Sequence, residues 1–583
     1  MQSTRVRILG VDVGGTFTDA VLLEDGRVRT AKVPTAVRQE ESVLAAAAAV
    51  GAAGVERFAH GTTVATNALL ERRGAVTAYV GNAGFEHLLH LRRQTRAHLY
   101  RPCEPHPVPL VPLERCHGVR GRLGPEAEIE PLDLDSLPAL GDVEAVAVCL
   151  LFSFRDSSHE RAVAGELRRL YPHVHVVASH EVAPEFREYE RASTTAADAY
   201  LWPVTARYLR ALAAAAARAG LPEPLVMLSS GGVAEAEAAA AHPAAILVSG
   251  PAGGVVGAGL VARRAGFPDA IAFDMGGTST DVCLLSGGRA ARVHERVVGG
   301  LPIRLPSVDV HTVGAGGGSL VGRDAGGAIR VGPESAGAHP GPACYGGGGG
   351  ATVTDANLLL GRLPAELPGG LVLDRDAAAA ALGDLDPADV VEVVNAEMLR
   401  ALRLISVERG HDPRDFALVA FGGAGPLHAC ALADELEIGV VLVPEAAGVL
   451  SALGLVASDE RRDRTVSHVR PLAQASDLPA EGEADLRYRG QSFELTVPLQ
   501  PELASAFHRA HEERYGYADP EREIDLVAIR TSEIVPGPDV SFRGAGHHSV
   551  EGPTVLELSG STCWVPDGWH GETNADGTLV LSR

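Results

Sequence analysis

One short motif occurs twice in this chain of 583 residues. The first copy reads VDVGGTFTDA at residues 11–20, and the second reads FDMGGTSTDV at residues 273–282. A constant offset shared by chemically demanding positions predicts two structurally related domains, each contributing one hairpin to a single cleft. The matching positions are Asp12, Gly14, Gly15, Thr16, Thr18 and Asp19 in the first copy, and Asp274, Gly276, Gly277, Thr278, Thr280 and Asp281 in the second.

Apolar runs flank both copies of the motif. Residues 6–11 and 17–23 surround the first copy, and a Glu-Asp-Gly turn leads to a third run at 28–33. The second copy repeats this plan with runs at 270–273, 282–285 and 290–297. Both copies therefore predict three-stranded antiparallel meanders with a Gly-Gly turn after the first strand.

The composition of these turns favours an anion site. Glycine adopts positive φ at little cost, so we expect successive backbone N–H groups to converge on an anion. A preceding aspartate would hold Mg²⁺, and the hydroxyls of Thr16 and Thr278 would donate to phosphate oxygens. Either copy alone is adequately explained as a plain hairpin, but two copies of the same string favour a phosphate site.

A third segment carries a related pattern. The apolar run Phe416–Phe421 predicts a strand, GGAGPLH follows at residues 422–428, and an Ala- and Leu-rich helix is expected through Leu436. A glycine turn between a strand and a helix N-terminus is a ready contact for an anion or a nucleotide. Together with the two hairpins, it resembles the phosphate and adenosine segments of the superfamily that contains actin, sugar kinases and heat-shock chaperones.

Other stretches narrow this resemblance to one family. From about residue 8 to about residue 529, the chain resembles the A-type, ATP-binding subunit of the hydantoinase/oxoprolinase family. The stretches that carry the resemblance are HGTTVATNALLE at 60–71, EYERAST at 188–194, SGPAGG at 249–254, HTVGAGGGS at 311–319, GPESAG at 332–337, TDAN at 354–357, VERGH at 407–411 and RYRGQ at 487–491.

The resemblance implies an α/β fold with duplicated actin- and sugar-kinase-like (ribonuclease H-like) domains around an ATP cleft, plus a small strand-rich C-terminal domain. We place the N-terminal domain at 1–195 and the core domain, with the second hairpin and the adenosine segment, at 196–460. The C-terminal domain at 461–583 is shorter than is usual in the family. We also expect a helix at Val204–Ala219 and a linker from Arg461 to Glu483.

The resemblance further implies a reaction. The A-type subunit would use ATP to phosphorylate the carbonyl oxygen of a cyclic amide, imide or ketone, and a separate B-type subunit would complete hydrolysis or carboxylation in a hetero-oligomer. Asp12 and Asp274 would bind Mg²⁺ and orient the γ-phosphate, while Asp19 and Asp281 would brace the hairpins by accepting backbone N–H bonds. The residues expected to hold phosphates are Gly14, Gly15, Thr16, Thr18, Gly276, Gly277, Thr278 and Thr280, and those expected to approach the nucleoside are Gly422, Gly423 and Gly425.

His60 has two interpretations. It follows an apolar strand and precedes Thr62 and Thr63, so a hydrogen-bonded histidine at a strand end explains it without any function. In the context of the family, HGTT becomes a segment of the cleft, and His60 a candidate for orienting the substrate or a phosphate.

Composition excludes several classes of protein. A net charge of −23 argues against nucleic acid or an anionic membrane surface as a partner. No apolar run approaches the ~20 residues of a membrane span, and seven scattered cysteines without a Cys-x-x-Cys pair favour a reduced, cytoplasmic protein. Lys32 is the sole lysine, so a P-loop or a Schiff-base mechanism is excluded.

Two other functional classes stay open. The same nucleotide motifs suit a stand-alone small-molecule kinase, which would release a stable phosphorylated product. They also suit a nucleotide-gated binding or assembly protein, which would polymerise or bind peptides.

Overall fold

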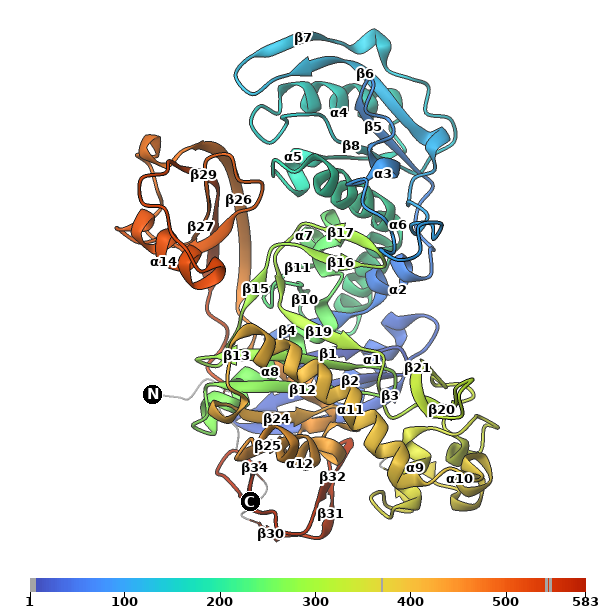
Figure 1. The fold of residues 1–583 in the computed structure, drawn as a ribbon. Helices are drawn as coiled ribbons and strands as arrows, with labels where there is room; N and C mark the ends of the chain where they lie inside the picture. The colour runs from blue at the N-terminus through green and yellow to red at the C-terminus, as the bar shows by residue number, and fades with distance from the viewer. Residues whose placement is uncertain (1–6, 368–370, 541–543, 545–547) are drawn as a thin grey trace, which may run out of the picture.

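The computed structural model describes residues 7–367, 371–540, 544 and 548–583, and two mixed sheets dominate it (Figure 1). The first copy of the motif lies in β1 (Arg7–Val13), β2 (Phe17–Glu24) and the turn between them. The same sheet contains β3 (Arg27–Pro34), β4 (Arg57–Thr62) and β10 (Pro224–Met227). Their order in the sheet is β3-β2-β1-β4-β10. The first three are antiparallel, as predicted, and β4 and β10 continue parallel to β1.

The second sheet repeats this order. It is built from β12 (Ala270–Met275), β13 (Thr280–Ser286), β14 (Arg289–Ala290), β24 (Ala417–Phe421) and β25 (Val440–Pro444). They are arranged as β14-β13-β12-β24-β25, with β24 and β25 parallel to β12. The fold is therefore the α/β arrangement expected from the repeated motif, with duplicated actin- and sugar-kinase-like (ribonuclease H-like) sheets.

The two copies differ in their third strand. The prediction of a strand over 290–297 is wrong, because β14 is two residues long and the chain then leaves the sheet. The edge of β13 is instead completed by β19 (Val310–Val313), which pairs antiparallel with Thr280–Cys283. The intervening residues form the hairpin of β16 (Arg296–Val298) and β17 (Leu301–Ile303), whose apolar side chains join the core beside the first sheet.

Two helices lie between the sheets and pack backbone against backbone. They are α8 (Ser249–Arg264) and α13 (Leu450–Ala457). A Cβ atom on Gly454 would lie 1.9 Å from the carbonyl oxygen of Gly253, and one on Gly10 of β1 would lie 2.2 Å from that of Ala452. No side chain fits at either position, so glycine is required for the helices to approach each other and the first sheet.

A long helix connects this core to a third sheet. Helix α6 (Glu188–Arg218) begins sixteen residues before the predicted start at Val204 and continues through Pro203, because its N-terminal part is almost entirely buried. The third sheet has the order β7-β6-β5-β8-β9 and lies at the top of Figure 1. No helix of the described residues is long and apolar enough to cross a membrane. The strands of the third sheet are β5 (Thr77–Asn82), β6 (Cys116–Leu123), β7 (Glu128–Asp133), β8 (Ala145–Val148) and β9 (His175–Ala178).

The C-terminal residues are strand-rich, as predicted, and they are shared between the two large sheets. The stretch predicted as a linker starts as strand β26 (Glu460–Pro471), which pairs with β29 (Ile524–Val535). These strands extend the first sheet beyond β11 (Val233–Glu235), whereas β34 (Thr578–Ser582) pairs with β25 of the second. Strands therefore pair across both of the expected domain boundaries, which lie at residues 195 and 460. Strand β26 opens with the consecutive charged residues 460–464, which hides the strand from a reading of hydrophobic periodicity.

We predict opposite effects of the same substitution at two helical glycines. Gly454→Ala places a Cβ against Gly253, so it should lower the free energy of unfolding by about 1–3 kcal/mol. Gly165→Ala in α4 (Ser158–Leu170) meets no atom within 4 Å and should instead stabilise by about 0.5–1 kcal/mol. Chemical denaturation of both variants checks this, and an unchanged midpoint for Gly454→Ala would contradict the packing described.

Candidate active site

The two aspartates of the motif occupy equivalent positions at the ends of β1 and β12. Asp12 lies opposite Gly61 of β4, and a Cβ atom on Gly61 would be 2.3 Å from Asp12 Oδ1. A Cβ atom on Gly422, directly after β24, would likewise be 2.3 Å from Asp274 Oδ1. Each carboxyl group thus rests against bare backbone of the neighbouring parallel strand, and each needs a glycine there.

The electrostatic environments of the two carboxyls are also alike. Burial raises the pKa of Asp12 to about 7, the charge of Asp19 adds to this, and Lys32 opposes it. Burial raises the pKa of Asp274 to about 8, with additional contributions from Asp281 and Asp12. Since Asp12 acts on the pKa of Asp274, the two carboxyls lie within electrostatic reach of each other. Both would be stabilised as anions by a cation placed between them.

The two hairpin turns are closed in the same way. Gly14 N–H donates to Phe17 O at 2.9 Å, and Gly276 N–H donates to Ser279 O at 3.0 Å. Thr16 and Thr278 are exposed at the tips of these turns. Thr18 and Thr280 are fully buried instead, and their hydroxyls bond to Thr35 Oγ1 at 3.1 Å and to Ala315 O at 2.6 Å.

The glycines of the turns serve by their small size. The expectation of positive φ is wrong for Gly14, Gly15, Gly276 and Gly277, none of which adopts a left-handed conformation. A Cβ atom on Gly15 or Gly277 would meet no other atom within 4 Å. The missing side chain therefore leaves the backbone of each turn open to a ligand.

Two further glycine segments surround the second hairpin. In the loop 314–318, Gly317 N–H donates to Gly276 O at 3.0 Å and Gly318 N–H donates to Gly277 O at 2.7 Å. In the segment predicted to contact adenosine, Gly422 does have a positive φ of 81°, and Ala424 N–H donates to Met275 O at 2.9 Å. Helix α12 (Gly425–Leu436) follows and ends at Leu436 as predicted, although it begins within the segment 422–428 that was expected to precede it. The structure thus brings both segments to Asp274.

His60 lies inside the first half, away from solvent. Its Nδ1 is 3.1 Å from Val11 O, which makes this nitrogen the donor, and its Nε2 accepts from the Tyr208 hydroxyl at 2.8 Å. Burial lowers the pKa of His60 to about 4, so the ring is neutral. Both nitrogens have protein partners and the residue is fully buried, which is the geometry expected of a residue that fixes β1 beside Asp12.

Asp19 and Asp281 accept hydrogen bonds from side chains, not from the backbone N–H groups that the sequence led us to expect. Lys32 Nζ lies 2.6 Å from Asp19 Oδ1, and Thr312 Oγ1 donates to Asp281 Oδ1. The partners come from the strands next to β2 and β13, namely β3 and β19. They fix the second strand of each meander to the third.

The donor set fits Mg²⁺. Among the described residues, no group of three or more His, Cys, Asp or Glu side chains could hold a metal ion. Two carboxylates within electrostatic reach nevertheless suit Mg²⁺, which typically takes one or two protein carboxylates and completes its shell with water and phosphate oxygens. Asp12 and Asp274 are the residues that would hold it.

Sequence analysis did not assign a role to Gly61 or to Thr312. Gly61 stands within the HGTT string, and a glycine inside an apolar strand signals close approach of another group. The sequence therefore indicates a close approach at Gly61, but it does not show that the approaching group is the Asp12 carboxyl. The contact of Thr312 depends on β19 replacing the third strand of the meander, which no local pattern indicates.

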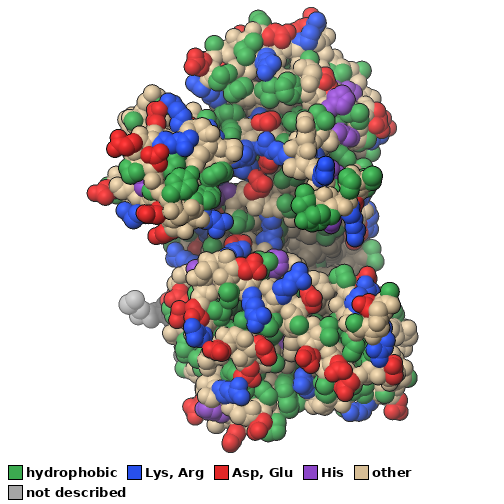
Figure 2. All heavy atoms as spheres, in the orientation of Figure 1, with side chains coloured by type: hydrophobic (Ala, Val, Ile, Leu, Met, Phe, Trp, Pro, Cys, Tyr) green, Lys and Arg blue, Asp and Glu red, His purple; other side chains and the backbone are tan. Residues whose placement is uncertain are grey.

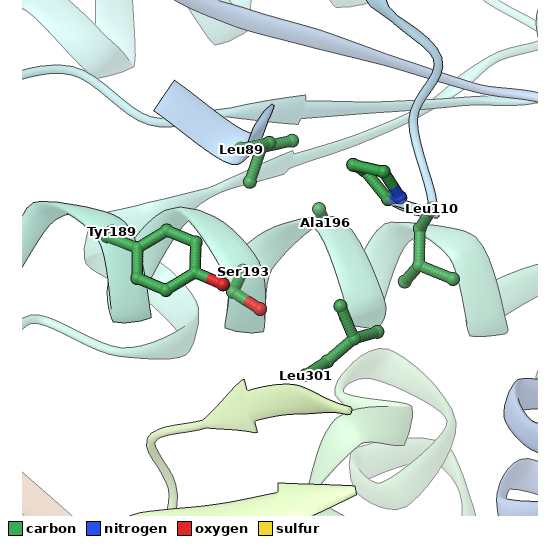
Figure 3. A pocket seen from close by; sticks show the side chains of 7 residues that line it. Leu89, Leu110, Tyr189, Ser193, Ala196 and Leu301 are labelled. Carbon is green, nitrogen blue, oxygen red and sulfur yellow. The ribbon is translucent and has the colours of Figure 1, made fainter. Parts of the chain in front are cut away.

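Figure 2 shows the molecule hollowed between its upper and lower parts. A separate small pocket lies against α6, where Tyr189 and Ser193 face Leu89 and Leu301 (Figure 3). Neither copy of the motif lines this pocket, and its mostly apolar side chains include no charged group.

Two sequence models of protein families match the chain. The one described as hydantoinase/oxoprolinase N-terminal region matches residues 8–171, and the one described as hydantoinase/oxoprolinase matches residues 191–464. The chain is 35% identical to an uncharacterized protein of Methanocaldococcus jannaschii, over 99% of both chains. It is 32% identical to the alpha subunit of caprolactamase from Pseudomonas jessenii, over 98% of this chain and 99% of that subunit.

Solved structures agree with these matches. The crystal structure of the ATP-dependent caprolactamase from Pseudomonas jessenii is similar with a TM-score of 0.86 at 31% identity, over 99% of both chains. Nucleotide-free acetone carboxylase shares the fold, with a TM-score of 0.78 at 24% identity and the same coverage. The two sequence alignments span 676 and 686 positions, more than the 583 residues of this chain, so both relatives contain segments that it lacks.

We predict that Gly61→Ala damages nucleotide binding more than folding. The new Cβ must displace the Asp12 carboxyl, and a displacement of about 1 Å should weaken Mg·ATP binding or turnover about 100-fold. Gly439→Ala, whose Cβ meets nothing within 4 Å, is the matched control and should behave as wild type. If calorimetry gives equal nucleotide affinities for Gly61→Ala and Gly439→Ala, the close contact between Gly61 and the Asp12 carboxyl is not needed for binding.

Proposed function

Because the chain belongs to the hydantoinase/oxoprolinase family, we propose that it is an ATP-dependent enzyme subunit that phosphorylates the carbonyl oxygen of a cyclic amide, imide or ketone. The observation that carries this proposal is the pair of equivalent carboxyls, Asp12 and Asp274, each next to an open Gly-Gly turn. Identity of 31% over the whole length of an ATP-dependent caprolactamase supports a lactam or a related compound as substrate.

The chemistry explains the need for ATP. In a lactam or an imide, the nitrogen lone pair delocalises into the carbonyl and makes its carbon a poor electrophile toward water. Attack of the carbonyl oxygen on the γ-phosphorus, with release of ADP, converts that oxygen into part of a phosphate leaving group. Water then adds to the carbon, and the C–N bond breaks as the ring nitrogen takes up a proton, which leaves an acyl phosphate. Attack of a second water on the acyl carbon releases inorganic phosphate and the ring-opened product.

In this proposal the protein supplies position and charge. Asp12 and Asp274 hold the metal ion, and Mg²⁺ when bound neutralises charge on the transferring phosphoryl group. The open backbone N–H groups at Gly15 and Gly277, with the exposed hydroxyls of Thr16 and Thr278, donate to phosphate oxygens. The nucleoside lies against the backbone of Gly422, Gly423 and Gly425.

Three residues that we first placed on the ligand take supporting roles in this proposal. Thr18 and Thr280 are buried with bonded hydroxyls, so they hold the turns in shape. His60 acts through β1, since it bonds Val11 O next to Asp12 and has no ring nitrogen left for a substrate. The sequence-based hypothesis that His60 is a catalytic residue orienting the substrate or a phosphate is therefore replaced by a positioning role.

The proposal includes a partner and a location. The caprolactamase relative is named a subunit, which supports a separate B-type subunit that completes hydrolysis or carboxylation in a hetero-oligomer. A cytoplasmic location agrees with seven cysteines that are all free, six of them buried.

Phosphate release from Mg·ATP tests the function. The purified chain is assayed against hydantoins, lactams including caprolactam, 5-oxoproline and ketones, with and without a co-expressed B-type partner. Substrate-stimulated release that gives ring-opened or carboxylated product only with the partner is the expected result. A stable phosphorylated product from the chain alone would identify a small-molecule kinase instead.

We predict that Asp12→Asn and Asp274→Asn each lower ATP turnover about 100-fold or more, because the amide cannot provide the negative charge that the metal site needs. Both variants should fold, since asparagine has the shape of the aspartic acid that burial favours. Asp142→Asn, at an exposed position, is the control. Turnover near that of wild type in both site variants would refute the assignment.

A further inference from the structure

Lys32 is the one lysine among 51 lysine and arginine residues. A chain that otherwise uses arginine for every such side chain places a lysine in the meander that carries the first motif. The two cations are not equivalent, because the ammonium group is compact and has three rotatable donors, whereas the guanidinium is a larger planar fork. Its position therefore calls for an explanation beyond charge.

The sheet register aligns Lys32 with the candidate site. Asp12 on β1 lies opposite Asp19 on β2, and Asp19 lies opposite Lys32 on β3. Directly opposed residues of antiparallel strands project from the same face of a sheet. Lys32 therefore shares a face with Asp12, and its ammonium reaches back to Asp19 Oδ1 at 2.6 Å.

The second meander has no ammonium at the matching place. There Asp274 lies opposite Asp281, and Asp281 lies opposite Thr312 on β19. The neutral Thr312 hydroxyl bonds Asp281 where Lys32 bonds Asp19. The two motifs thus match in their carboxylates and differ in the group bonded to the second aspartate, which is an ammonium in the first and a hydroxyl in the second. The charge of Arg296 also acts on Asp281, but no hydrogen bond joins the two side chains among the described contacts.

Lys32 also reaches the second half of the molecule. Its Nζ lies 3.4 Å from Gly448 O in the short helix η7 (Ala447–Val449). The preceding carbonyl, Ala447 O, accepts from the N–H of Gly422, the glycine beneath Asp274. The Lys32 ammonium therefore lies where the first meander contacts the segment 447–449, which in turn bonds the glycine next to Asp274.

The contacts of Lys32 with Asp19 and Gly448 leave one N–H of its ammonium without a protein acceptor. An ammonium carries three N–H bonds, and Asp19 and Gly448 account for two of them. The Lys32 side chain keeps 32% of its surface exposed. Its charge also lowers the pKa of Asp12 and of Asp274, which places it within electrostatic reach of both carboxyls.

We propose that Lys32 is a further nucleotide-binding residue, whose free N–H donates to the terminal phosphates of ATP from the side of the first hairpin. This inference rests on the proposed function, since it needs ATP between the two hairpins. Asp19 and Gly448 fix the ammonium in place, and the lysine supplies a phosphate with a positive partner that the second hairpin does not provide.

Calorimetric titration with Mg·ATP, Mg·ADP and AMP tests the proposal on wild type, Lys32→Met and Lys32→Arg. A hydrogen bond from a charged group to the terminal phosphates should make Lys32→Met bind ATP about 10- to 100-fold more weakly. AMP should bind as in wild type, because it lacks those phosphates. Lys32→Arg restores the charge without the compact ammonium and should recover part of the ATP affinity.

Arg29→Met is the matched control for net charge. Arg29 lies on the same strand, pairs with Glu24 and is half exposed. An odd spacing from Lys32 places it on the other face of the sheet. Its replacement should leave the affinities for all three nucleotides within about twofold of wild type, because exposed charges contribute little at this distance.

The outcomes separate the two claims. If Lys32→Met weakens ATP, ADP and AMP equally, or weakens none, Lys32 does not contact the terminal phosphates and the inference is wrong. The same holds if its melting temperature falls while the ratio of ATP to AMP affinity stays constant, since that is a structural effect. If wild type binds no nucleotide, the proposed function itself fails.

Discussion

Withdrawing a carboxylate from water is costly, and this chain partly buries two of them, Asp12 and Asp274, at equivalent places. Asp12 and Asp274 each lie at the end of a central strand, pressed against a neighbouring strand or loop that is bare because glycine stands there. Burial raises the pKa of both groups, and the charges of Asp281 and Asp12 raise that of Asp274 further. Such a pair is favourable only when a cation joins it. The turns, the glycine loops and the paired aspartates of the meanders all serve to hold these two carboxyls in place.

The connection between the halves explains why the site can be shared. Helices α8 and α13 pack through Gly253, Gly257 and Gly454, where a side chain would overlap the opposing backbone. Helix α13 also lies on β1, through the contact of Gly10 with Ala452. Close backbone packing of this kind fixes the first sheet relative to the helices that carry the second. The distance between the two hairpins is therefore set by the core and not by loops.

The sequence predicted the parts of this site that are local. A repeated string of residues predicted both hairpins, their first two strands and the Gly-Gly turns, and a separate glycine segment predicted the helix that ends at Leu436. It also gave the duplicated fold, because two copies of one pattern require two copies of one sheet. Asp12 and Asp274 were identified in the same way, although their roles are a proposal.

Long-range pairing defeated the rest of the prediction. The third strand of the second meander comes from β19, some twenty residues after the expected one, and only the sheet shows that it carries Thr312 to Asp281. The stretch from Arg461 to Glu483 was expected to be a linker because it is acidic and rich in Pro and Ala, yet its first part lies in β26 and pairs with β29. The buried environments of His60 and Thr18 likewise depend on Tyr208 and Thr35, which the motifs do not include.

The central claim is that the carbonyl oxygen of the substrate is transferred to phosphate. The most direct test labels that oxygen with ¹⁸O in the compound that stimulates ATP hydrolysis, and then measures the label in the released inorganic phosphate by mass spectrometry. The account predicts one ¹⁸O atom in each phosphate formed during complete turnover with the partner subunit. Phosphate that carries only oxygen from ATP and water, with the label retained in the product, would contradict it.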